Sequence, residues 1–97
     1  ATYAINSDEE RISLIEFALL SHPSYSSTAL AGAQLSMLPI SLKKTYPIKF
    51  LQGEYSRQIG NNEEAIRHWF DILNHLPADS DQARTLRLYI SKLEKAF

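Results

Sequence analysis

The sequence predicts an all-α fold of about five helices that pack as antiparallel hairpins. Apolar residues recur at helical spacing along most of the 97-residue chain. No segment alternates apolar and polar residues with the β-branched enrichment that is typical of strands. Prolines stand at the ends or in the first turns of the helical stripes, where they interrupt few backbone hydrogen bonds. We therefore interpret the chain as a single helical domain over residues 1–97.

The first two predicted helices span residues 8–22 and 26–38. Ser7 precedes three acidic residues and then an apolar stripe, which is the pattern of a helix N-cap and first turn. Pro23 ends the first helix and Pro39 the second, because the residue before a proline is disfavoured in the helical conformation. Small residues in the second helix indicate close packing against a neighbouring helix.

The remaining predicted helices span residues 46–59, 62–76 and 80–96, and residues 40–45 form either a short helical turn or a loop. Gly60 and the asparagines after it are a strong signal for a helix C-cap and a turn. Helices that are joined by such short connections pack as antiparallel hairpins. The last predicted helix is expected to cap the preceding pair.

Composition excludes several classes of function. A formal net charge of -1 provides no positive field for nucleic acid or an anionic membrane. The absence of cysteine excludes thiol catalysis, disulfides and cysteine-ligated zinc. No apolar run approaches the ~20 residues that span a bilayer, so we expect no membrane segment in this chain. The chain begins abruptly at Ala1, as a segment cut from a longer protein would.

Titratable residues do not predict catalysis, a cofactor or a metal site. His68, Asp71 and His75 lie at spacings of three and four on one predicted helix. The two histidines are two turns apart, about 10 Å along the helix axis, and cannot share one ion without a third ligand between them. The acidic pairs at 9–10 and 63–64 lie in first turns, where they compensate the helix dipole. We expect no enzymatic activity.

The stretch from Gly53 to Pro77 has the spacing of one tetratricopeptide repeat. Ala65 follows Gly53 after 12 residues, Trp69 follows after four more, Pro77 after eight more, and Gly60 marks the turn between the helices. Small residues at 53 and 65 let the two helices cross closely, and Trp69 fills the gap beside the crossing. Pro77 stops the second helix. The stretch therefore resembles a tetratricopeptide hairpin.

A closer resemblance concerns the Ala-Ile-x-x-Trp-x-x-Ile-Leu pattern of residues 65–73, the Leu-Pro pair after it and the closing helix. This half of the chain is similar to the C-terminal tetratricopeptide domain of bacterial cytochrome c biogenesis factors, accessory subunits of heme lyase. The resemblance implies a periplasmic, chaperone-like module that holds a protein or peptide, with apocytochrome c or heme lyase subunits as candidate partners. The alternative is an architectural or oligomerisation domain of a larger protein, without a ligand groove.

In a tetratricopeptide hairpin, the first helix lines a concave peptide-binding face. The register set by Gly53 places four residues there: Phe50, Glu54, Arg57 and Gln58. Phe50 would be an apolar anchor and Arg57 a charge contact. The earlier half of the chain would add Leu30, Gln34 and Met37. An uncovered face with Phe50 and Arg57 exposed would favour peptide binding, whereas a buried Phe50 would favour the architectural alternative.

Overall fold

The computed structural model describes residues 7–21 and 24–95, and these residues form six α-helices and one π-helical segment without strands. The elements are α1 (Asp8–Glu16), η1 (the π-helix Phe17–Ser21), α2 (Tyr25–Ser36), α3 (Ile40–Lys43), α4 (Tyr46–Gln58), α5 (Asn62–Leu73) and α6 (Asp81–Glu94). The prediction of an all-α fold is confirmed. None of these helices is long and apolar enough to cross a bilayer.

Helix ends follow local capping chemistry. Ser7 accepts a hydrogen bond from the backbone N–H of Glu10, as the sequence predicts. Helix α2 begins at Tyr25, before the predicted start, because Ser24 and Ser27 form a reciprocal capping box. The ambiguous segment 40–45 contains the short helix α3. The predicted helix ends at residues 22 and 96 lie outside the described residues.

Two predicted elements differ from the structure. The last turn of the first predicted helix is the π-helix η1, which the apolar spacing does not reveal. Helix α5 ends at Leu73 and not at Leu76, and the chain continues in tighter turns. In these turns the backbone N–H of His75 donates to Ile72 O, and that of Leu76 donates to Leu73 O. The helix unwinds before Pro77 because the following proline ring disfavours the helical conformation at residue 76.

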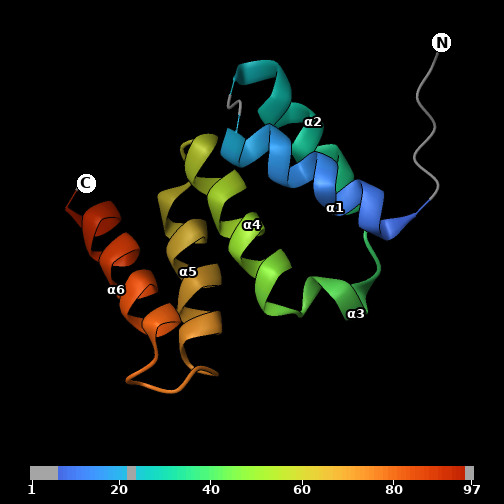
Figure 1. The fold of residues 1–97 in the computed structure, drawn as a ribbon. Coiled ribbons are helices and arrows are strands. Elements are labelled where there is room, and N and C mark those ends of the chain that lie inside the picture. The colour runs from blue at the N-terminus through green and yellow to red at the C-terminus, as the bar shows by residue number, and fades with distance from the viewer. Residues whose placement is uncertain (1–6, 22–23, 96–97) are drawn as a thin grey trace, which may run out of the picture.

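Helix α4 lies between two layers of the molecule. Helix α5 lies beside it on one side, with α6 against the outer side of α5, and α1, η1 and α2 lie on the other side, as Figure 1 shows. Each side has its own apolar cluster. The first contains Ile15, Ala18, Leu19, Ala31, Leu35, Leu38, Ile48 and Leu51. The second contains Ala65, Trp69, Ile72, Leu86, Ile90 and Leu93, with Phe50 packed against it.

The α4–α5 hairpin is closed by a contact between Gly53 and Trp69. A Cβ atom at residue 53 would lie 2.2 Å from Nε1 of Trp69, so only glycine leaves room for the indole. The indole N–H donates to the backbone carbonyl of Phe50 at 3.3 Å, and Ala65 is fully buried. Gly60 makes the turn between the helices with φ at 86°, a conformation that side chains disfavour. Pro77 is exposed between α5 and α6.

Candidate functional site

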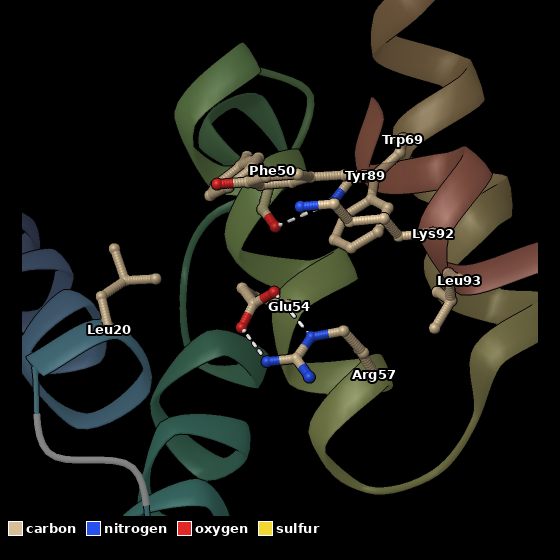
Figure 2. Close-up of a pocket in the computed structure, with 8 residues that line it drawn as sticks. All are labelled: Leu20, Phe50, Glu54, Arg57, Trp69, Tyr89, Lys92 and Leu93. Carbon is tan, nitrogen blue, oxygen red and sulfur yellow. Dashed lines mark hydrogen bonds and ion pairs between the residues drawn. The ribbon is translucent and has the colours of Figure 1, made fainter. Parts of the chain in front are cut away.

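A cavity of about 430 Å³ opens between α4 and α6, opposite the end of η1. Its wall is formed by Leu20, Phe50, Glu54, Arg57, Trp69, Tyr89, Lys92 and Leu93 (Figure 2). Phe50, Glu54 and Arg57 share one face of α4 because they are spaced four and three residues apart. Tyr89 and Lys92 are spaced three apart on α6, so they also share a face.

Three aromatic rings form the apolar wall. Phe50 stacks on Trp69 with ring centroids 6.2 Å apart, and Tyr89 lies 6.0 Å from Phe50 and 5.8 Å from Trp69. Trp69 is buried, Phe50 is half-buried, and Tyr89 is the most exposed of the three. Leu20, whose exposed fraction is 50%, lies across the cavity from these rings. The cavity therefore offers apolar surface from four different elements, η1, α4, α5 and α6.

Glu54 is a nearly buried carboxylate at the base of the cavity. Arg57 donates to its two oxygens from Nε at 2.9 Å and from Nη2 at 2.7 Å, and Gln58 donates to it from Nε2 at 3.1 Å. Burial raises the pKa of Glu54, but the hydrogen bonds from Arg57 and Gln58 and the charge of Arg57 outweigh it, so the pKa lies below its ordinary value. The hydrogen bonds to Glu54 raise the pKa of Arg57 in turn. The two residues are a fixed ion pair.

Gln58 connects this ion pair to the other half of the molecule. Its Nε2 also donates to the backbone carbonyl of Leu19 at 2.8 Å, and its Oε1 accepts from Oγ1 of Thr28 at 2.8 Å. Leu19 lies in the last turn of η1, where carbonyl groups lack helical partners. Gln58 therefore fastens both η1 and α2 to α4. Leu20 directly follows Leu19, so the hydrogen bond from Gln58 to the Leu19 carbonyl also holds Leu20 at the cavity.

Lys92 is the second cation at the cavity. Its side chain is exposed on α6, and within residues 7–21 and 24–95 it makes no hydrogen bond or ion pair. Arg57, in contrast, has two of its three nitrogens on Glu54. The ammonium group of Lys92 is therefore the freer of the two positive charges.

The structure brings only part of the predicted peptide-binding face together. Phe50, Glu54 and Arg57 line the cavity, and Gln58 lines a neighbouring hollow of about 720 Å³ with Arg57. Leu30, Gln34 and Met37 do not line the cavity, because α2 packs against α1 and α4 on the far side of α4. Gln34 accepts a hydrogen bond from Nε of Arg11 at 2.9 Å, and Leu30 and Met37 are exposed.

Sequence reasoning missed four residues of the cavity wall: Leu20, Tyr89, Lys92 and Leu93. On α6, Ile90 is buried, whereas its neighbour Tyr89 lines the cavity. Adjacent residues on a helix point about 100° apart. The available signal was an aromatic residue beside the apolar stripe of this helix, one turn before Lys92.

His68 and Asp71 of α5 and His75 just after this helix, which are the residues considered as metal ligands from their spacing, interact with other residues. Nε2 of His68 lies 3.6 Å from Oε1 of Glu64, and burial lowers the pKa of His68. Nδ1 of His75 lies 2.8 Å from the carbonyl oxygen of Asp71, and the Asp71 carboxylate pairs with Lys49 at 2.9 Å. Across the described part of the chain, no three histidine or acidic residues gather as metal ligands would.

Neither the protein-family models nor the curated proteins and solved structures compared with this chain give a match.

Proposed function

We propose that this domain binds a peptide or a segment of another protein in the cavity between α4 and α6. The observation that supports the proposal is an open aromatic wall at the same cavity as Lys92, a cation without an ion pair among the described residues. Aromatic residues and arginine, but not lysine, are enriched among the residues that dominate protein interfaces.

The size of the cavity sets the mode of binding. A volume of about 430 Å³ accommodates one or two anchoring side chains and not a whole peptide. Phe50 and Tyr89 would receive the anchor, and the rest of the segment would run along the exposed faces of α4 and α6. Affinity in the micromolar range is expected, because a small interface must offset the ordering of a flexible peptide.

The candidate partner comes from the resemblance of residues 46–97 to cytochrome c biogenesis factors. It makes apocytochrome c, held by a chaperone-like periplasmic module during heme attachment, the first ligand to test. The proposal does not include catalysis or a cofactor, since Glu54, the one acid among the described residues that line the cavity, is already bound by Arg57.

The test is a calorimetric titration of the domain with peptides that together cover an apocytochrome c. Tyr89→Ala removes one side of the wall, and Leu88→Ala is the matched control, because Leu88 is exposed on the same helix and does not line the cavity. We expect Tyr89→Ala to weaken binding about tenfold or more, as for an interface anchor, and Leu88→Ala to leave it unchanged.

Two results would redirect the proposal. Equal affinities of the two variants would mean that a bound peptide does not occupy this cavity. No binding at millimolar peptide would refute the cytochrome proposal and favour the architectural alternative, in which Phe50 serves only as packing for Trp69.

A further inference from the structure

The charges that line the cavity do not balance. Glu54 contributes one negative charge, and Arg57 and Lys92 contribute one positive charge each. Arg57 and Glu54 neutralise each other through two hydrogen bonds. One positive charge therefore remains, on the ammonium group of Lys92.

Apolar side chains line the same cavity as this exposed charge. Tyr89 precedes Lys92 by one helical turn, Leu93 follows it, and Leu20 of η1 lies across the opening. Arg57 also lines the cavity, and its Nη1 makes no hydrogen bond within the described residues. A single anionic group would balance the charge, whereas a phosphate with two charges would exceed it. An ion pair beside apolar walls is screened less by water than one on an open surface.

We infer that the cavity recognises one carboxylate that lies next to a bulky apolar side chain, and that Lys92 is the counter-ion of this carboxylate. The inference rests on the proposed peptide-binding function and names its ligand class. The apolar side chain packs between Leu20 and the rings of Phe50 and Tyr89. The carboxylate belongs either to an aspartate or glutamate inside the segment or to the end of a chain.

Three short peptides of otherwise identical sequence separate these sources. The first has an internal Glu-Leu pair and blocked ends. The second has Gln-Leu and blocked ends. The third has Gln-Leu at its C-terminus with a free terminal carboxylate. Each is titrated by calorimetry into the wild-type domain, into Lys92→Gln and into Lys95→Gln. Lys95 is the matched control, since it is exposed near the end of the same helix and does not line the cavity.

We expect at least one carboxylate peptide to bind the wild-type domain about tenfold more tightly than the neutral peptide, as one partly shielded charge contact would produce. The preference should disappear in Lys92→Gln and persist in Lys95→Gln. Whichever carboxylate peptide binds more tightly identifies the source of the group.

Equal affinity of the wild-type domain for all three peptides would overturn the inference and leave peptide binding intact. Equal losses in Lys92→Gln and Lys95→Gln would also overturn it, because they would indicate a general charge effect. No binding of any peptide at millimolar concentration would refute the proposed function together with the inference. Far-UV circular dichroism and thermal melts of both variants ensure that lost binding is not lost folding.

Discussion

Replacing Gly53 with alanine tests the contact that closes the α4–α5 hairpin. The added Cβ would lie 2.2 Å from Nε1, 2.6 Å from Cδ1 and 2.8 Å from Cε2 of Trp69. Ordinary carbon contacts are about 3.5–4.0 Å, so either the indole or the α4 backbone must move. Trp69 has little freedom to move, because only 1% of it is exposed and Phe50 and Tyr89 pack on it.

Two opposing effects determine the magnitude. Alanine is favoured over glycine inside a helix by about 1 kcal/mol, which stabilises the variant. Overpacking a closely packed site costs about 1–3 kcal/mol and more for severe overlaps. We therefore expect Gly53→Ala to lower the free energy of unfolding by about 1–2 kcal/mol. In a domain of this size, that corresponds to a fall of roughly 4–16 °C in Tm.

A double-mutant cycle with Trp69→Phe isolates the clash. Phenylalanine lacks Nε1, so it removes the atom that the new Cβ would approach most closely. With Phe at position 69, Gly53→Ala should be clearly less destabilising than in the wild-type domain, because only the ring carbon next to Cγ remains close to the new Cβ. This gives a coupling energy of about 1 kcal/mol. Unfolding is followed by far-UV circular dichroism, because Trp69 is the chain's only tryptophan. Additive free energies in the cycle would refute the close-contact explanation.

Gly32→Ala is a control in which the added methyl group meets a side chain that can move. A Cβ at residue 32 would meet the far end of the Tyr55 ring at 2.6 Å. Tyr55 is only partly buried, so its ring can turn away from the added methyl group. We expect a smaller loss of stability than for Gly53→Ala.

Four further perturbations follow from the same contacts. Gln58→Leu leaves the carbonyl of Leu19 without its partner and should destabilise the domain by about 1–3 kcal/mol in urea unfolding. The pKa of Glu54 is lower in the folded state than the unfolded value of 4.5. The stability that ionised Glu54 contributes is therefore complete above pH 4.5 and is lost as pH falls through the folded pKa. Glu54→Gln should remove this contribution to the loss of stability in acid. Gly60→Ala forces a side chain to φ 86° and should cost about 1 kcal/mol, more than Gly60→Asn in a thermal melt. Ala65→Leu should overpack the fully buried site and lower stability by about 1–3 kcal/mol; an unchanged melt would contradict the hairpin packing.

Helix positions were predictable from the sequence because their signals are local. Ser7, Pro47 and Gly60 act on the residues next to them, whatever the rest of the fold does. The π-helix was not predictable in this way. The carbonyl of Leu19 in η1 accepts a hydrogen bond from Gln58, which is 39 residues away in the sequence. A contact between such distant residues leaves no local signal in the sequence of the first helix.

The site was predictable only where one helix defines it. Phe50, Glu54 and Arg57 share a face through their spacing alone, so any helix over this segment groups them. The placement of Tyr89 and Lys92 depends on how α6 rotates against α5. Leu30, Gln34 and Met37 were placed by assuming that α2 repeats the role of α4. Instead Gln34 binds Arg11 of α1, a contact between segments that no repeat register specifies.

Helix α4 packs with two of its faces into two different apolar clusters. Ile48 and Leu51 pack into the cluster shared with α1 and α2, whereas Phe50 packs into the cluster shared with α5 and α6. Gln58 lies where these faces meet, and it binds both Glu54 and the carbonyl of Leu19. The orientation of Arg57 and the position of Leu20 therefore depend on one amide side chain. Because a ligand in the cavity would contact both Arg57 and Leu20, its affinity should respond to Gln58 even though Gln58 is not part of the cavity wall.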